Sequence, residues 1–179
     1  MPKNYWTPAR RKYSRLMGLY ARLPSLARDY VEAMLWEYHG SAIPSATAFT
    51  TIDLWQRWCS DNYSFIRKYR FWKTLKTEKH LDKEVPLLEK CDVTFFSYVL
   101  GEIAPAIDHH PGFNIIRDFR NELAHSSDFE VVDDLSFHEH FRRVEEAIDQ
   151  LFARDLQRRQ RWRKIVQHIR DDGNRCVIL

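Results

Sequence analysis

The sequence predicts an all-α protein, an up-and-down bundle of four to five helices with a basic helix at its carboxyl end. Apolar side chains recur every three or four residues along most of the chain, which is the period of an amphipathic helix. Only five glycines and seven prolines occur, too few for the many turns of a β-sandwich. We expect a helical domain over residues 5–155 and a basic helix with a short tail over 156–179.

The first half predicts three helices. Pro8 suits the first turn of a helix over residues 10–22, and Pro24 should break or kink it, because proline lacks the N–H that helical bonding needs. The segments expected after Pro24 are a helix, a linker and a longer helix, over residues 26–38, 40–51 and 54–75.

The second half predicts further helices, two of them with recognisable starts. Asp92 can cap a helix N-terminus. The stripe that this helix should bury comprises Val93, Phe96, Val99, Leu100 and Ile103. The next helix should bury Ile115, Ile116, Phe119 and Leu123. Ser136 and Glu139 have the spacing of a capping box, which would open a helix over 137–151 that runs on through the basic tail.

Charged residues are unevenly distributed. Residues 1–30 contain seven bases and one acid, residues 158–175 contain seven bases and two acids, and residues 31–157 contain fourteen bases and twenty-two acids. A general nucleic-acid-binding surface is basic across one broad face, which an acidic body with two basic ends does not offer. The pattern better fits an end that approaches an anionic membrane.

The cysteines indicate a cytosolic protein. Cys59, Cys91 and Cys176 form no CxxC pair, no zinc-binding pattern and no even disulfide set. Cys59 and Cys91 lie within apolar patterns and are expected to be inert core thiols. No apolar run approaches the roughly 20 residues of a transmembrane helix, and no signal-peptide core is present.

One segment, Arg120-Asn121-Glu122-Leu123-Ala124-His125, carries candidate catalytic chemistry. RNA supplies its own nucleophile, the 2′-hydroxyl, so its cleavage needs a proton acceptor and a group that stabilises the crowded phosphate, while a metal is optional. His125 can exchange protons near neutral pH, as imidazoles do. Arg120 can hold two phosphate oxygens through its planar guanidinium, and Asn121 can orient the imidazole or the phosphate.

Helix geometry limits how these residues can cooperate. Five residues at about 100° each place Arg120 and His125 roughly 140° apart on an ideal helix. They can meet at one phosphate only if the helix ends near Ala124 or if a second protomer completes the site. The same geometry aligns Arg117 with Asn121 and His125, which makes Arg117 a candidate RNA-binding residue.

A structural role is the alternative for the same residues. Arg120 has nearby acids with which to pair, among them Asp118 and Glu122. His125 can cap the C-terminus of its helix, where a positive charge is favoured. The acids in residues 128–134 would also repel an RNA backbone.

The motif resembles that of the HEPN superfamily, Arg-x(4–6)-His, in the form Arg-Asn-x-x-Ala-His. The resemblance is strong over residues 92–152, weaker over 5–80, and closest to a branch found in animal proteins beside ubiquitin-ligase or NTPase modules. It implies a bundle that forms a homodimer or a heterodimer with another HEPN chain, with the motifs of both protomers lining one cleft. Many members are metal-independent ribonucleases that need no cofactor, and others are non-catalytic RNA-binding or assembly modules.

A second candidate RNA-binding segment lies between residues 65 and 80. Six bases alternate there with aromatic residues, so that Arg67 and Arg70 are candidate RNA contacts beside rings on which nucleobases can stack. The alternative, which the spacing favours, is a helix with its aromatic residues in the core and its bases in solvent.

The last four residues, Cys176-Val177-Ile178-Leu179, match the C-a-a-X prenylation pattern, and a final leucine favours geranylgeranyl. One lipid chain anchors only marginally, so the bases of residues 158–175 would supply the second signal, at the cytoplasmic face of a membrane. Residues of this helix that could touch the membrane are Trp162, Ile165, Val166 and Ile169. The alternative is a cysteine placed by chance beside a solvated helix, or a chain whose native end is not Leu179.

Overall fold

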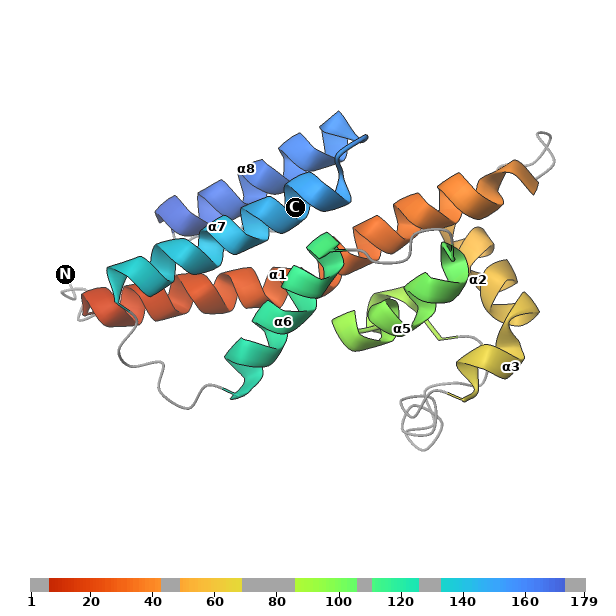
Figure 1. The fold of residues 1–179 in the computed structure, drawn as a ribbon, viewed down its shortest axis with the longest axis horizontal. Helices are drawn as coiled ribbons and strands as arrows, with labels where there is room; N and C mark the ends of the chain where they lie inside the picture. Colours follow the sequence, from red (N-terminus) through yellow and green to blue (C-terminus); the bar gives the residue numbers. More distant parts are fainter. Residues whose placement is uncertain (1–6, 43–48, 69–85, 106–110, 126–132, 173–179) are drawn as a thin grey trace, which may run out of the picture. The chain divides into compact units, whose positions relative to one another are not determined.

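The computed structural model describes residues 7–42, 49–68, 86–105, 111–125 and 133–172. All of its regular elements in these ranges are helical, which confirms the predicted all-α class (Figure 1). The elements are α1 Pro8–His39, η1 Gly40–Ala42, α2 Thr51–Asp61, α3 Tyr63–Ile66, η2 Leu88–Lys90, α5 Val93–Ile103, α6 Pro111–His125, α7 Asp134–Leu151 and α8 Leu156–Asp172. Among these helices, none is both long enough and apolar enough to cross a membrane.

The chain forms two compact units. Unit 1 comprises Met1–Leu26 and His110–Leu179, and unit 2 comprises Ala27–His109. Unit 1 therefore contains the first part of α1 with α6, α7 and α8, whereas unit 2 contains the rest of α1 with α2, α3 and α5.

In unit 1, the apolar stripes of four helical segments form the core. The buried residues are Leu16, Leu19 and Leu23 of α1, Phe113, Ile116, Phe119 and Leu123 of α6, Phe137, Phe141, Val144 and Ile148 of α7, and Trp162 and Val166 of α8. The stripe predicted for α6 is thus buried at three positions, and Ile115 is half-buried. This packing leaves the polar sides of α6 outside the core.

The first turn of α6 lies close against the end of α7. A Cβ atom added to Gly112 would stand 2.7 Å from the carbonyl oxygen of Ala147 and 3.0 Å from Cγ of Leu151. Real Cβ atoms do not approach a backbone oxygen so closely, because a contact shorter than about 3 Å is repulsive. Glycine at this position therefore sets the distance between the two helices.

In unit 2, aromatic side chains fill the core. Trp55 stacks on Trp58 with ring centroids 5.7 Å apart, and it meets Phe95 and Phe96 edge-on at 6.3 and 6.4 Å. The indole N–H of Trp55 donates to the carbonyl oxygen of Pro86 at 2.7 Å, so the buried polar atom is satisfied.

The start of α5 agrees with the sequence. The Asp92 carboxylate accepts from the backbone N–H of Phe95 at 2.8 Å, as a capping residue does. The five apolar residues predicted to be buried on this helix are all in the core. Cys59 and Cys91 are also buried, which confirms their predicted core positions, and burial raises the pKa of both thiols.

Two predictions for the first half were wrong. Pro24 was expected to break or kink the first helix, and the break does not occur, since α1 continues through the exposed Pro24 to His39. The helix predicted over 54–75 begins earlier, at Thr51, and ends at Asp61. Thr50 and Asp53 form a reciprocal capping box at its start, and Asn62 separates it from the short α3. Residues 69–75 lie outside the described part.

The predicted start of α7 was also wrong. Asp133, rather than Ser136, is the N-cap: its carboxylate accepts from the backbone N–H of Ser136 at 2.6 Å, and this bond lowers the pKa of Asp133. Because the helix begins three residues earlier than expected, Ser136 is a donor inside the first turn. Glu139 is engaged by Arg142 instead.

The helix of the basic tail is separate from α7, although one continuous helix was expected. α7 ends at Leu151, with Phe152 as its C-cap. Asp155 caps the start of α8, because its carboxylate accepts from the backbone N–H of Arg158 at 2.9 Å. α8 then packs within unit 1, where Trp162 and Val166 are only 5% and 2% exposed. The prediction that these two side chains touch a membrane is therefore wrong, because the protein's own core covers them.

Candidate functional site

The candidate motif occupies the second half of α6. Phe119 and Leu123 face the core, which leaves Arg117, Arg120 and Asn121 half-buried on the other sides of the helix. This placement follows from the helical period, since the apolar residues at positions 116, 119 and 123 share one side. The candidate residues are thus held by a packed helix and not by a loop.

Arg120 and Asn121 form a bonded pair. Nη1 of Arg120 donates to the side-chain oxygen of Asn121 at 3.1 Å. Asn121 was predicted to orient the imidazole or the phosphate, and in the structure its amide contacts the guanidinium. One edge of the planar Arg120 head is thereby fixed, which limits the directions in which its other donors can point.

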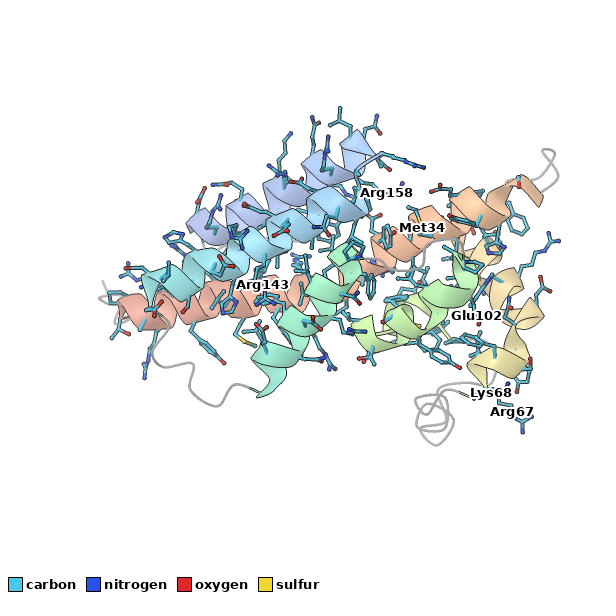
Figure 2. The ribbon with its side chains drawn as sticks, viewed as in Figure 1. Met34, Arg67, Lys68, Glu102, Arg143 and Arg158 are labelled. Atoms are coloured by element: carbon cyan, nitrogen blue, oxygen red, sulfur yellow. The ribbon has the colours of Figure 1, made fainter. Side chains whose placement is uncertain are left out.

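The two acids closest to Arg120 in sequence contact other arginines. Glu122 accepts two bonds from Arg143 of α7, at 2.6 and 3.0 Å, and this pairing raises the pKa of Arg143, which Figure 2 labels. Asp118 lies 3.6 Å from Nε of Arg117. Arg117, the candidate RNA-binding residue, is therefore in a surface ion pair. Such pairs are weak enough for a phosphate to compete.

His125 is the last residue of α6, and its side chain lies outside the described part. α6 ends at His125, one residue after Ala124, and the backbone of both Arg120 and His125 is helical. Helical geometry then places Arg120 and His125 roughly 140° apart around the axis and about 7.5 Å apart along it. This separation along and around α6 is the geometry with which any shared phosphate site must comply.

The sequence reasoning missed His140 of α7. Its ring lies 5.2 Å from the ring of Phe119, and its Nδ1 atom is buried without a hydrogen-bond partner among the described residues. Burial lowers the pKa of His140; Glu122 opposes this shift, Arg143 adds to it, and Glu139 opposes it. The sequence did hold a signal, because position 140 shares the helical side of buried Phe137 and Val144.

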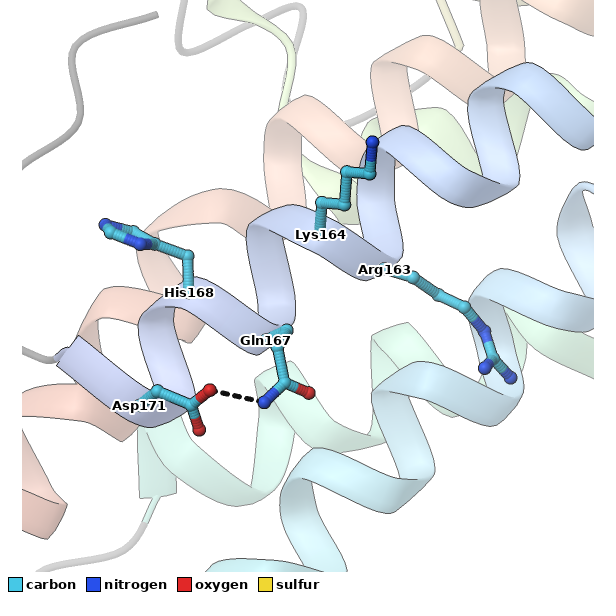
Figure 3. Close-up of a pocket in the computed structure, with 5 residues that line it drawn as sticks. All are labelled: Arg163, Lys164, Gln167, His168 and Asp171. Carbon is cyan, nitrogen blue, oxygen red and sulfur yellow. Dashed lines mark hydrogen bonds between the residues drawn. The ribbon is translucent and has the colours of Figure 1, made fainter.

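A shallow depression of about 550 Å³ lies on α8, away from the motif (Figure 3). Its lining residues are Arg163, Lys164, Gln167, His168 and Asp171. Three of these side chains already have partners, because Gln167 donates to Asp171 and Arg163 donates to Asp149 of α7. Nowhere in the described ranges do three or more metal-binding side chains gather.

The remaining predicted residues are placed only in part. Arg67 is exposed at the end of α3, whereas Arg70 and Cys176 lie outside the described residues. Searches with this chain found no matching protein-family model, no matching curated protein and no matching solved structure.

Proposed function

We propose that this protein is a metal-independent endoribonuclease of the HEPN type that cleaves RNA with Arg120, Asn121 and His125. The observation that carries the proposal is the bonded Arg120–Asn121 pair on a packed helix that ends at His125. A guanidinium has five N–H donors in one plane, so fixing one edge orients the edge that binds phosphate oxygens.

The reaction assigns one role to each residue. His125 accepts the proton of the 2′-hydroxyl while the 2′-oxygen attacks the adjacent phosphorus. Arg120 stabilises the additional negative charge on the phosphate oxygens, and Asn121 holds the guanidinium in place. The bond from phosphorus to the 5′-oxygen breaks, and the imidazolium returns its proton to that oxygen. The products are a 2′,3′-cyclic phosphate and a 5′-hydroxyl.

A second copy of the chain completes the site in this proposal. Arg120 and His125 are five positions apart on α6, a spacing of roughly 140° on an ideal helix, so that Arg120 of one protomer would act with His125 of its partner. Because the commonest protein dimers are twofold symmetric, each dimer would hold two such composite sites.

The test is cleavage of a mixed single-stranded RNA in EDTA. His125→Ala should lower the rate by about 10²–10⁴-fold, which is the usual contribution of a general acid–base group. His138→Ala is the matched control, since His138 is an exposed histidine outside the motif. Equal rates for wild type and His125→Ala would contradict the proposal.

A mixing experiment tests the composite site. Arg120→Ala and His125→Ala are each inactive alone. In an equimolar mixture half of the dimers are mixed, and each mixed dimer regains one intact site, so about a quarter of wild-type activity should return. No recovery, with mixed dimers demonstrated by native mass spectrometry, would place both residues of each site in one chain.

The alternative is a non-catalytic HEPN module that binds RNA or another chain. The bond between Arg143 and Glu122 favours this alternative, because it connects the motif helix α6 to α7 and so gives the motif segment a structural role. In that case the motif lies in a dimer contact, and wild type and His125→Ala show the same negligible cleavage while Arg120→Ala weakens the dimer.

We also propose that the carboxyl end tethers the protein to a membrane through a geranylgeranyl group on Cys176. The support is the C-a-a-X sequence and the preceding bases. After expression in a cell that prenylates proteins, intact mass should show an added lipid that Cys176→Ser abolishes. An unmodified wild-type chain would contradict the tether.

A further inference from the structure

In unit 2, α3 and α5 meet through two parallel aromatic rings. The rings of Phe65 and Tyr98 are stacked with centroids 4.4 Å apart and planes only 6° from parallel. The Tyr98 hydroxyl donates to the backbone oxygen of Phe65 at 3.1 Å, which fixes the tyrosine in this orientation. Both side chains are half-buried, so part of the stacked pair is open to solvent.

Two cations follow the stack directly. Arg67 and Lys68 come just after α3, and both are exposed. In the ranges that the structure covers, neither takes part in an ion pair, and Figure 2 labels both at the C-terminal end of α3. One acid, Glu102, lies one helical turn after Tyr98. Burial raises the pKa of Tyr98, and the negative charge of Glu102 raises it further. Two exposed positive charges therefore follow the ring of Phe65 by two and three residues.

We propose that Phe65, Tyr98, Arg67 and Lys68 form a binding surface for single-stranded RNA. A nucleobase would extend the parallel stack, and the two cations would contact the phosphates on either side of it. Every base has a flat π face, so such a surface holds RNA with little sequence preference. The choice of RNA as the ligand rests on the proposed function, and the surface would hold substrate for it.

A lipid surface fits these residues less well. Membrane-interface aromatics insert beside other apolar side chains, whereas here the rings are tied to each other and to a backbone oxygen. The exposed neighbours are charged rather than apolar. A fixed pair of parallel rings instead matches the stacking that unpaired bases seek.

The experiment measures binding without cleavage. The probe is a fluorescent oligouridylate of about twelve nucleotides, within the usual footprint of single-strand binders. Its 2′-O-methyl groups remove the nucleophile, so the result does not depend on nuclease activity. Tyr98→Leu removes the ring and keeps apolar cover, and Tyr98→Phe keeps the ring and removes the hydroxyl.

Tyr98→Leu should weaken binding about tenfold, since stacking on one ring contributes about 1–3 kcal/mol per base. Tyr98→Phe should bind within about twofold of wild type, because the stacking surface is kept. Equal binding by wild type and Tyr98→Leu would overturn the proposal. Equal losses in both variants, at unchanged melting temperature, would also overturn it by assigning the effect to the hydroxyl.

The cations are tested through salt dependence. Arg67→Gln with Lys68→Gln should lower the slope of log affinity against log salt by about 1.4, or about 0.7 for each phosphate contact. Arg154→Gln with Lys164→Gln, two exposed bases of unit 1, is the matched control and should leave the slope unchanged. If the first pair lowers binding to phosphatidylserine vesicles and leaves RNA binding unchanged, the surface binds lipid and the proposal fails. Absence of EDTA-resistant cleavage by wild type, with RNA binding that depends on Tyr98, would instead count against the nuclease alone.

Discussion

The two units are held together by different interactions. In unit 1, ion pairs connect α7 to the other three helical segments: Lys12 of α1 with Asp134, Glu122 of α6 with Arg143, and Arg163 and Arg170 of α8 with Asp149 and Glu145. In unit 2, the contacts between helices include stacked aromatic rings, bonds from side chains to backbone oxygens, and a bond from the indole N–H of Trp36 to the Thr51 hydroxyl at 3.0 Å. The candidate catalytic helix thus belongs to the unit whose helix contacts respond to pH and salt.

Several uncharged side chains of unit 2 donate to backbone oxygens. Trp55, Tyr98 and Cys91 donate to the backbone oxygens of Pro86, Phe65 and Leu87. Two of these acceptors, the carbonyl oxygens of Phe65 and Leu87, also accept from the backbone N–H groups of Lys68 and Lys90 at 3.0 and 2.9 Å. Such bonds hold irregular chain against a core without net charge, so unit 2 should tolerate changes in pH and salt better than unit 1.

Glycine substitutions should give the largest contrast between the units. Gly112→Ala in unit 1 forces a Cβ against Ala147 and should cost about 1–3 kcal/mol of unfolding free energy, as overpacking usually does. Gly101→Ala in unit 2 has open space and should stabilise α5 by about 0.5–1 kcal/mol, because alanine favours the helix. Hydrogen exchange measured separately for α6–α7 and for α5 reports both effects.

The pair of variants is its own control, since both add one methyl group inside a helix. If Gly112→Ala leaves exchange of α6 and α7 unchanged, the two helices are not held at the described distance. Slower exchange in α6–α7 would contradict the described contact outright.

The sequence predicted the features that depend on residues close together in the chain better than those that depend on distant residues. The cap at Asp92 and the apolar stripe behind it are local, so the sequence located α5 well. The start of α7 failed because Asp133, Asp134 and Ser136 can all cap, and only the folded chain shows which one does. The end of α2 failed because the apolar period continues past Asn62.

The candidate site shows the same limit. The motif was visible as six consecutive residues, and the pairing of Arg120 with adjacent Asn121 is local. Glu122 and Arg143 are 21 residues apart, and Phe65 and Tyr98 are 33 apart, so neither contact could be read from spacing. Acids and bases were abundant on both sides, and only packing of α6 on α7 selected the partners.

A smaller effect should come from His140, which tests whether unit 1 responds to pH. Burial lowers the pKa of this histidine, so the unfolded chain binds the proton more readily than the folded one. Its stabilising contribution is therefore complete above about pH 6.5, the ordinary value, and is lost as the pH falls through the lower folded value. His140→Leu removes this loss.

Chemical unfolding measures the free energy of unfolding of His140→Leu relative to wild type at two pH values. This difference should favour the variant by on the order of 1 kcal/mol more at about pH 5 than at about pH 8. The groups that face His140 are Glu122, Arg143 and Glu139, and all three remain in the variant. A wild-type to variant difference that is the same at both pH values would show that protonation of His140 does not oppose folding.

The smallest expected effect is that of the ion pair between α6 and α7. Arg143 and Glu122 form two parallel bonds, but their side chains are 25% and 49% exposed, so solvent weakens the attraction. A double-mutant cycle with Arg143→Gln and Glu122→Gln should give a coupling of about 0.2–1 kcal/mol at low salt, and less at high salt. The same cycle measured on EDTA-resistant cleavage separates two uses of the pair. If the cleavage rate changes in proportion to stability, the ion pair only holds α6 in place. If the rate shows a coupling while stability is unchanged, the ion pair also sets the position of Arg120 and Asn121.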